Sequence, residues 1–394
     1  GRSRRLGGAH VTEPILRVQN LSITYTVGAG VFQAVSDVSL DIYPGQVVGI
    51  VGETGCGKST LAQAIPRLMP EPPASIGSGK IIFRGTDLVQ VPKRKMPMVR
   101  GTGIGMIFQE PLNSLNPAYR VFDQIVESIQ IRHFREIGVV KSFQGGEVPF
   151  DYSKRPTTKV SSALTRSVIP EGAAEEIVKQ RIRTRSDYRK EVLDYLRLVR
   201  INDPETIIDL YPHELSGGMR QRIMIAMALS EKPSLLIADE PTSALDVTIQ
   251  AQVLTLMKDL IDEVDASILF ISHDLGVIAE TADEIGVMYA GRIIEYGPVD
   301  EVFRSPRHPY TKMLLAAAPR IYKSDGSLRS IPGNVPNLSR PPSGCRFHPR
   351  CPLARPVCKE KTPPLAPVTP SGPDTPPDAH RSACFFSEEV PGLP

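Results

Sequence analysis

Two stretches near the start of the chain carry apolar residues in the pattern of strands. The first covers residues 14–27, and the second covers residues 31–42 and ends at the turn Tyr43-Pro44-Gly45. Further along, three short runs are apolar after their first residue, which is typical of strands buried on both faces. These runs are residues 46–51, 234–238 and 267–271.

Helix-like segments follow or separate the buried strands. They cover residues 59–68, 247–264 and 275–282. Strands that alternate with helices favour a parallel sheet with helices on both faces. The hydrophobic pattern therefore predicts an α/β fold.

A more polar, helix-leaning region occupies about residues 111–215, between the two halves of the predicted sheet. Its middle, residues 132–190, lacks clear periodicity and holds 13 Lys and Arg against 7 Asp and Glu. Polar segments without periodicity are usually surface loops. We expect a solvated insertion, with a surface for lipid headgroups or a partner subunit as the alternative.

The composition excludes several classes of protein. The 394 residues contain no apolar stretch near 18 residues, so no membrane-spanning helix is expected. A formal net charge of +3 is too small to indicate nucleic acid as an electrostatic partner. Residues 1–13 are basic and Gly-rich with no apolar core after them, which predicts a flexible N-terminus and not a secretory signal. We expect a cytoplasmic protein that binds no nucleic acid.

The strongest motif is Gly52-Glu53-Thr54-Gly55-Cys56-Gly57-Lys58-Ser59, directly after the buried run at residues 46–51. It matches the pattern G-x-x-x-x-G-K-S/T between a strand and a helix, where it marks a phosphate-binding loop. The glycines let successive backbone N–H groups point at phosphate oxygens, and the helix N-terminus adds positive partial charge. Lys58 can reach the terminal phosphates, and the hydroxyl of Ser59 can bind Mg²⁺.

A second motif ends the apolar run at residues 234–238 with two carboxylates, Asp239 and Glu240. Ligands of open α/β sheets bind at the carboxyl ends of the strands, so both side chains are placed near the phosphate loop. Asp239 is suited to hold Mg²⁺, and Glu240 is suited to orient and polarise the attacking water. Together with the loop, this pair predicts a nucleoside triphosphatase.

A third motif, Leu215-Ser216-Gly217-Gly218-Met219, precedes an apolar helix at residues 223–229. A serine and two glycines ahead of a helix form a second anion-binding terminus, distinct from the phosphate loop. One ATP cannot easily occupy both termini of one subunit. The motif therefore predicts a dimer in which the second site of each subunit closes over the nucleotide of the other.

The ordered motifs resemble those of the ATP-binding subunit of an ABC transporter, over nearly all of residues 14–280. The resemblance implies an ABC-type P-loop ATPase domain over residues 14–320, with a RecA-like core, an antiparallel β subdomain and a helical subdomain at about 111–215. This chain departs from the family in two ways. Met219 stands where Gln is commonest, and the segment between Gln109 and Ser216 is several tens of residues longer, the surplus falling in residues 132–190.

The resemblance also assigns roles to single residues. Tyr25 would stack on adenine, and Gln109, in Ile107-Phe108-Gln109-Glu110, would be the Q-loop residue. Asp246 would belong to the D-loop, Ser243-Ala244-Leu245-Asp246, and His273 would be the switch histidine at the γ-phosphate. The implied catalytic residues are Glu240, His273 and Lys58, and the implied Mg²⁺ ligands are Ser59, Gln109 and Asp239. The implied ATP contacts are Tyr25, Gly52, Glu53, Thr54, Gly55, Cys56, Gly57, Lys58, Ser59, Thr60, Gln109, Ser216, Gly217, Gly218 and Asp246.

Proline and cysteine mark the last part of the chain as different. Nineteen of the 37 prolines lie after Ser305, and four of the five cysteines, Cys345, Cys351, Cys358 and Cys384, lie after Gly344. Four thiols in a segment with too few apolar residues for a core indicate a cross-link, which could be two disulfides, a zinc site or an iron–sulfur cluster. A cytoplasmic location disfavours disulfides, and the spacing C-x5-C-x6-C lacks the short zinc knuckle, whereas a cluster tolerates varied spacing.

The tail also resembles the C-terminal extension of oligopeptide/dipeptide transporter ATPases. The matching motifs are His308-Pro309-Tyr310-Thr311, residues 314–319, Ile331-Pro332-Gly333, Gly344-Cys345-Arg346-Phe347, Arg350-Cys351-Pro352 and His380-Arg381-Ser382-Ala383-Cys384. Members with these cysteines hold a [4Fe-4S] cluster. The resemblance therefore implies a cluster on Cys345, Cys351, Cys358 and Cys384, with zinc as the second choice, in a small irregular Pro/Cys-rich domain over residues 321–394.

The resemblance as a whole implies a subunit that hydrolyses ATP to power the import of oligopeptides or dipeptides. Its implied partners are two transmembrane permease subunits, a second and related ABC ATPase subunit, and an extracytoplasmic substrate-binding protein. It would lie on the cytoplasmic face of the membrane as a peripheral subunit. The alternatives are the same role for nickel or an oligosaccharide, and a soluble ABC ATPase without a permease. A single ATPase cassette and the lack of heptads disfavour the last.

Overall fold

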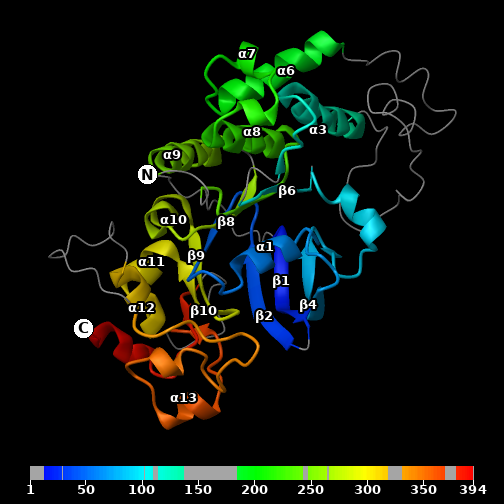
Figure 1. The fold of residues 1–394 in the computed structure, drawn as a ribbon. Coiled ribbons are helices and arrows are strands. Elements are labelled where there is room, and N and C mark those ends of the chain that lie inside the picture. The colour runs from blue at the N-terminus through cyan, green and yellow to red at the C-terminus, as the bar shows by residue number, and fades with distance from the viewer. Residues whose placement is uncertain are drawn as a thin grey trace.

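The computed structural model describes residues 13–28, 30–101, 103–109, 114–136, 184–242, 247–263, 266–317, 331–368 and 379–393. Residues 1–12 of the predicted N-terminal segment, and residues 137–183 of the predicted insertion, lie outside these ranges. The described residues form two β-sheets, with a layer of helices at one end and a C-terminal region at the other (Figure 1).

The two strand-like stretches near the start form part of a four-stranded antiparallel sheet. β1 (Leu16–Val27) pairs with β2 (Gly30–Ile42) and with β4 (Ala74–Phe83), and β5 (Thr86–Asp87) extends the sheet beside β4. Buried and partly buried positions alternate over the first part of β1, as expected for a strand with one face on the core. That face packs against α1 (Lys58–Ala64), which shares its hydrophobic cluster.

Eight strands form the larger sheet: β3 Val47–Val51, β6 Ile104–Ile107, β7 Leu235–Asp239, β8 Ser267–Ile271, β9 Glu284–Tyr289, β10 Arg292–Pro298, β11 Ala366–Pro367 and β12 Arg381–Ser382. Their order is β11-β12-β10-β9-β3-β8-β7-β6. The neighbours from β9 to β6 are parallel, and β9, β10, β12 and β11 are joined antiparallel. The three continuously apolar runs form β3, β8 and β7, where every residue is buried. The predicted α/β class is confirmed.

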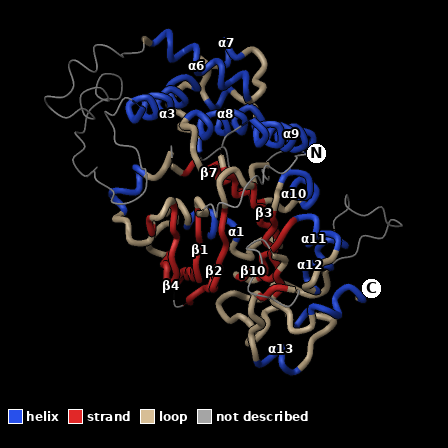
Figure 2. Tube along the Cα trace, turned by 180° about the vertical axis from the view of Figure 1, so that it is seen from behind, coloured by secondary structure: helices blue, strands red, loops and turns tan. Residues whose placement is uncertain are grey.

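Four of the described helices lie in the layer beyond the β6 and β7 edge of the larger sheet (Figure 2). They are α3 Val121–Glu136, α6 Arg185–Leu198, α7 Pro204–Ile207 and α8 Gly217–Ser230. α3, α6 and α8 pack against one another, and α8 also packs against β6. α8 begins at Gly217, before the helix that apolarity alone predicts, because the side chain of Ser216 caps it.

Both ends of the predicted insertion are helical, since α3 extends to Glu136 and α6 begins at Arg185. Arg132, at the start of the predicted insertion, is only 3% exposed. Its guanidinium donates to the carbonyl oxygen of Ser230 at 2.7 Å and to the hydroxyl of Tyr195 at 3.0 Å, and it pairs with the carboxylate of Glu191. Arg132 therefore joins the helices of this layer and does not lie in a solvated segment.

The helix predicted over residues 59–68 is shorter than expected. α1 ends at Ala64 because Pro66 has no backbone N–H to donate and Arg67 takes a left-handed φ of 55°. The other two predicted helices agree with α9 (Val247–Glu263) and α10 (Leu275–Thr281) to within one residue at each end. In the part of the chain that the structure describes, no helix is long and apolar enough to cross a membrane.

The described residues of the C-terminal region form short elements that pack on the end of the larger sheet (Figure 1). After β10 come α11 Val299–Arg304, α12 Pro309–Ala316, the 3₁₀ turn η3 His348–Arg350, α13 Pro356–Glu360 and the 3₁₀ segment η4 Ser387–Gly392. Phe347 and Ala383 belong to the same buried cluster as Tyr289 of β9 and Tyr310 of α12. The described residues after 331 therefore share a core with the rest of the chain.

Candidate functional site

The phosphate loop lies between β3 and α1, and its backbone depends on glycine at two positions. Gly52 has φ 153°, and a Cβ there would lie 2.1 Å from the carbonyl oxygen of Met288 in β9. Gly57 has φ 105°, and a Cβ there would lie 2.2 Å from the carbonyl oxygen of Ala34 in β2. Neither position has room for a side chain, so the two sheets hold the loop in a tight curve. The thiol of Cys56 is fully buried in the core, and burial raises its pKa.

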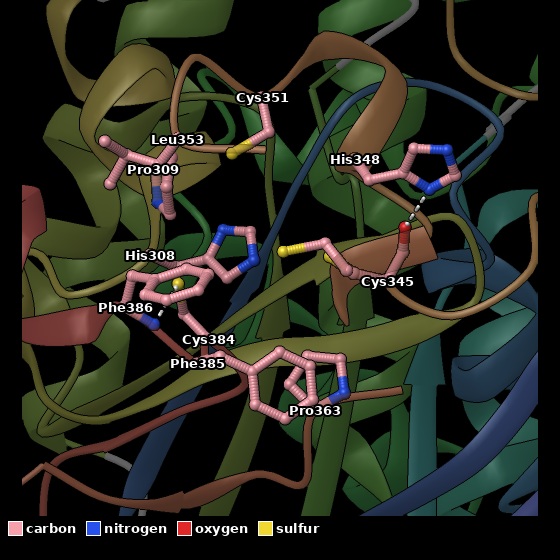
Figure 3. A pocket seen from close by; sticks show the side chains of 11 residues that line it. His308, Pro309, Cys345, His348, Cys351, Leu353, Pro363, Cys384, Phe385 and Phe386 are labelled. Carbon is pink, nitrogen blue, oxygen red and sulfur yellow. Dashed lines mark hydrogen bonds between the residues drawn. The ribbon is translucent and has the colours of Figure 1, made fainter. Parts of the chain in front are cut away.

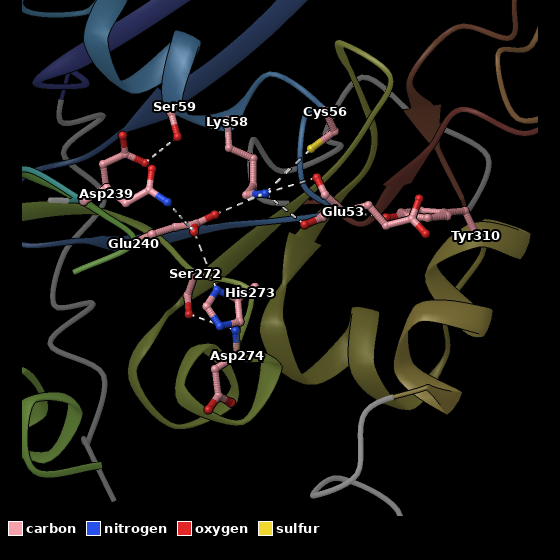
Figure 4. Close-up of polar contacts among 12 residues, drawn as sticks. Glu53, Cys56, Lys58, Ser59, Asp239, Glu240, Ser272, His273, Asp274 and Tyr310 are labelled. Atoms are coloured by element: carbon pink, nitrogen blue, oxygen red, sulfur yellow. Dashed lines mark hydrogen bonds and ion pairs between the residues drawn. The ribbon is translucent and has the colours of Figure 1, made fainter. Parts of the chain in front are cut away.

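The side chain of Lys58 lies within this loop and is 4% exposed (Figure 4). Its Nζ donates to the carbonyl oxygens of Gly52 at 2.9 Å and of Glu53 at 3.2 Å, and it lies 3.4 Å from Oε1 of Glu240. A buried ammonium needs such a set of oxygen partners, because burial removes its hydration. The structure thereby fixes a positive charge inside the loop, as phosphate binding requires.

Ser59 and Asp239 form the pair of oxygen donors that the sequence assigns to Mg²⁺. The Oγ of Ser59, in the first turn of α1, donates to Oδ1 of Asp239, the last residue of β7, at 2.9 Å. Asp239 is 1% exposed, and burial raises the pKa of its carboxyl to about 6. A nearby cation would stabilise this buried carboxylate, and hydroxyl and carboxylate oxygens suit Mg²⁺. The donor set fits the metal.

Three of the predicted residues, Lys58, Gln109 and His273, lie next to the carboxylate of Glu240. Nε2 of Gln109, which follows β6, donates to Oε2 of Glu240 at 3.3 Å, and Nδ1 of His273 lies 3.6 Å from the same oxygen. The backbone of Glu240 has φ 43°, and its N–H donates to the carbonyl oxygen of Ile271 at 3.0 Å. Hydrogen bonding to His273 lowers the pKa of Glu240 and raises that of His273. The carboxylate is therefore held in the ionised form that a base needs.

The remaining predicted contacts divide between the loop and the neighbouring sheet. Tyr25 lies on β1 opposite Phe32 of β2. Ala34, two residues after Phe32, has its carbonyl oxygen against Gly57 of the loop. The tip of the loop is exposed at Thr54 and Gly55, and Thr60 is partly exposed in the first turn of α1. The sheet that carries Tyr25 thus packs directly on the phosphate loop. Asp246 lies outside the described residues.

The third motif lies in a different layer of the chain, at the start of α8 (Figure 1). The Oγ of Ser216 accepts the N–H of Met219 at 3.3 Å, and both Ser216 and Gly217 are exposed. Gly218 is buried, and a Cβ there would lie 2.5 Å from Cγ2 of Ile249 in α9. Gly218 therefore allows the close packing of α8 on α9, while the two residues before it face solvent.

The four cysteines of the tail, predicted to bind a metal cluster, line a single cavity (Figure 3). Burial raises the pKa of the Cys345 thiol, that of Cys351 to about 11 and that of Cys384 to about 12, and nearby thiols add to each shift. All four are free of disulfides. Within the described ranges, no group of three or more His, Cys, Asp or Glu side chains is arranged to hold a metal ion.

Two residues that contact the phosphate loop are not predicted by the loop motif. Tyr310 and Arg350 both bind Glu53, the second residue of the motif. They belong to His308-Pro309-Tyr310-Thr311 and Arg350-Cys351-Pro352, which have no pattern typical of a phosphate site. The sequence therefore marks these motifs without indicating what they contact.

Known proteins resemble this chain in sequence over nearly its whole length. The family model for ABC transporters matches residues 35–243, and that for the C-terminal region of oligopeptide/dipeptide transporters matches residues 294–358. The dipeptide transport ATP-binding protein DppD of Bacillus subtilis is 40% identical over 377 residues, 96% of each chain. The oligopeptide transport ATP-binding protein OppD of the same organism is 43% identical over 356 residues, 90% of this chain and 86% of its own.

Solved structures agree with the fold. A dimeric ATP-binding cassette, MJ0796, solved with ADP and phosphate, covers 72% of this chain and 98% of its own, at 21% identity and a TM-score of 0.53. The cbiO1 protein of Clostridium perfringens covers 74% and 91%, at 25% identity and a TM-score of 0.50. This chain belongs to the ATP-binding subunits of ABC transporters, in the oligopeptide/dipeptide group. It is an ATPase of the ABC type.

Proposed function

We propose that this subunit powers the import of oligopeptides or dipeptides. The observation that carries the proposal is the combined match to the ABC transporter model and to the oligopeptide/dipeptide C-terminal region, with relatives named for dipeptide and oligopeptide transport at 40% and 43% identity. The transported solute does not bind to the ATPase subunit of such a transporter. Its identity therefore comes from the relatives, and not from any site in this chain.

The proposed assembly contains two transmembrane permease subunits, an extracytoplasmic substrate-binding protein and a second, related ATPase subunit. This chain would lie on the cytoplasmic face of the membrane, at its periphery. The exposure of Ser216 and Gly217 at the start of α8 supports a dimer, because these residues are free to face the nucleotide of another subunit. We also propose the division predicted from the sequence, an ATPase domain over residues 14–320 and a cysteine-rich region over residues 321–394.

The proposed hydrolysis depends on positioning and charge, with little covalent chemistry from the protein. Lys58 and the loop amides bind the phosphates, and Tyr25 stacks on the adenine. Ser59, Asp239 and Gln109 would hold Mg²⁺, which when bound offsets negative charge on the phosphates. Glu240 accepts a proton from the attacking water while Gln109 and His273 hold its carboxylate in place.

Reconstitution tests the transport proposal directly. The chain is combined with the permease subunits and the second ATPase in lipid vesicles, and the binding protein is supplied with a dipeptide, an oligopeptide, nickel or an oligosaccharide. We expect ATP-dependent uptake, and a rise in ATP hydrolysis, only with the peptides. Uptake of nickel or the oligosaccharide alone would contradict the peptide assignment, and full ATPase activity without any membrane partner would favour a soluble ATPase.

We further propose that Cys345, Cys351, Cys358 and Cys384 hold a [4Fe-4S] cluster. The arrangement of the four thiols around one cavity supports this, because separated stretches of the tail bring them to the same place. Thiolates are the usual ligands of such clusters. The bound cluster would supply a cross-link and folding energy to a region built from short elements.

Metal analysis of the full-length protein, purified without oxygen, tests the cluster. We expect about four iron and four sulfide per chain, and visible absorption that Cys351→Ser removes. Cys56→Ser, which changes the cysteine in the phosphate loop, is the matched control and should keep the iron. Stoichiometric zinc without iron would overturn the assignment.

A further inference from the structure

Two motifs of the C-terminal part contact Glu53 of the phosphate loop, and a third motif contacts one of these two. The hydroxyl of Tyr310 accepts a hydrogen bond from the backbone N–H of Glu53 at 2.9 Å (Figure 4). The guanidinium of Arg350 donates to both carboxylate oxygens of Glu53, at 2.8 and 3.1 Å. The same guanidinium donates to the carbonyl oxygens of Pro332 at 2.8 Å and Ile331 at 3.4 Å, in the motif Ile331-Pro332-Gly333.

The contact between Arg350 and Glu53 is well protected from solvent. The side chain of Arg350 is 5% exposed, and that of Glu53 is 24% exposed. The guanidinium lies 5.7 Å from the ring centre of Tyr289 and 5.9 Å from that of Phe347. These two rings pack with the ring of Tyr310 at centre distances of 4.7 to 5.5 Å. A bidentate pair fixes orientation as well as distance, so the side chain of Glu53 cannot turn independently of this cluster.

The backbone of Glu53 connects this contact to the phosphate-binding part of the loop. Its carbonyl oxygen accepts from Nζ of Lys58 at 3.2 Å and from the N–H of Cys56 at 3.3 Å. Holding Glu53 therefore fixes an oxygen that positions Lys58, and it fixes the turn that carries the following amides. A loop that is already ordered loses less conformational freedom when a ligand binds.

We propose that Arg350 and Tyr310 are positioning residues of the ATP site, which act through Glu53 to hold the phosphate loop in its binding conformation. The C-terminal region then contributes directly to the affinity for ATP. The effect falls on nucleotide binding more than on the chemical step, because Gln109 and His273, which lie outside the phosphate loop, also hold the carboxylate of Glu240.

Nucleotide titration of the full-length protein tests this proposal. The Kd for ATP with Mg²⁺ is measured by calorimetry in a Glu240→Gln background, which slows hydrolysis, and kcat and KM are measured with Glu240 intact. We expect Arg350→Ala to raise Kd and KM about tenfold and to change kcat much less. Arg350→Lys keeps the charge but loses the bidentate geometry, so its Kd should lie between those of Arg350→Ala and the unchanged protein.

Two further variants separate positioning from general stability. Tyr310→Phe removes one hydroxyl and keeps the ring, so it should fold and raise Kd about threefold. Arg355→Ala is the control for loss of an arginine–carboxylate pair in the same region, because Arg355 pairs with Glu389 at 2.6 Å and lies 3.9 Å from the ring centre of Phe386, at a more exposed position. Its Kd should not change. The proposal is overturned if Arg350→Ala and Tyr310→Phe both bind ATP as Arg355→Ala does, or if kcat falls while Kd stays constant.

Discussion

The nucleotide edge is the end of the larger sheet that carries the phosphate loop, Asp239 and Glu240. It and the C-terminal region position their functional side chains by different means. At the nucleotide edge, Asp239 and Glu240 come at the end of a fully buried strand with a parallel neighbour on each side. In the C-terminal region, β11 and β12 have two residues each and α13 has five. Backbone ladders therefore set the first site, whereas the second depends on a few side-chain contacts. A sheet tolerates the loss of one side chain, and the C-terminal region is expected to be more sensitive.

Two arginines of the C-terminal region contact residues near the start of the chain, and each is adjacent to a cysteine. Arg350 precedes Cys351 and binds Glu53 in the phosphate loop. Arg346 follows Cys345 and donates to Oε1 of Gln33 at 2.7 Å, to Oγ of Ser36 at 2.9 Å and to the carbonyl oxygen of Ala290. Arg350 therefore contacts the phosphate loop, and Arg346 contacts β2.

The largest expected effect is confined to the nucleotide edge. Glu240→Gln removes the carboxylate that accepts the proton of the attacking water, so kcat should fall by about 10²-fold or more while ATP binding persists. Steady-state hydrolysis and calorimetric binding of ATP measure the two quantities. Substantial remaining hydrolysis would show that Glu240 is not the base.

A smaller effect is expected where the C-terminal region meets β2. Arg346 is 8% exposed, and burial lowers the pKa of its guanidinium to about 10. Arg346→Ala would leave buried oxygen acceptors without a donor, so the free energy of unfolding should fall by about 3 kcal/mol. Urea unfolding measures the change. Arg304→Ala is the control, because its side chain is 81% exposed, and an equal loss in both variants would contradict the role of Arg346.

Acid sensitivity should also reside in the C-terminal region. His308 is 1% exposed, its Nδ1 accepts the N–H of Tyr310 at 3.1 Å, and burial lowers its pKa to about 3 from 6.5. Above pH 6.5 the imidazole is neutral in both states, whereas between pH 6.5 and 3 only the unfolded chain takes up the proton. This group alone should therefore remove about 2 kcal/mol of stability between pH 6.5 and pH 5.

His308→Asn tests this, because an amide oxygen can still accept the N–H of Tyr310 without titrating. The variant should lose less stability than the unchanged protein on going from pH 7 to pH 5, whatever its stability at pH 7. Urea unfolding at both pH values gives the difference. If both proteins lose the same amount, His308 does not carry the acid sensitivity.

The smallest effect is expected at the surface of the C-terminal region. Arg355 and Glu389 form an ion pair at 2.6 Å, and their side chains are 47% and 45% exposed. Solvent screens such a pair, so Arg355→Ala should reduce the free energy of unfolding by at most about 1 kcal/mol. A thermal unfolding scan is sufficient to check it. If Arg355→Ala reduced the free energy of unfolding as much as Arg346→Ala, this would contradict the expectation that buried contacts in this region stabilise the fold more than exposed ones.

Sequence reasoning predicts the nucleotide edge well because its signals are local. Continuous apolar runs mark β3, β7 and β8, and the polar residues that follow them must lie at one edge of a parallel sheet. Lys58, Ser59, Asp239, Glu240, Gln109 and His273 are accordingly close together in the structure. The end of α1 is less predictable, since Pro66 and the left-handed Arg67 override an apolar pattern that continues to residue 68.

The C-terminal contacts could not be predicted in the same way. Arg350 and Glu53 are 297 positions apart in the chain, and no periodicity relates them. Arg132 likewise belongs to a basic stretch in the sequence, but its partners Tyr195 and Ser230 lie on two other helices. Which charged side chains pair over such distances depends on the completed fold. The partners therefore cannot be predicted from the composition of a segment.

The pairing of β12 with β10 has a consequence for how the chain completes its folding during synthesis. Arg381 and Ser382 lie opposite Tyr296 and Glu295, so the edge of β10 stays open until the ribosome has released residue 382. An open strand edge is a template for pairing with other chains. β11 then becomes the outer strand, and its Pro367 has no N–H to offer a further strand. Truncation before residue 381 is therefore expected to expose this edge and promote aggregation of newly made chains.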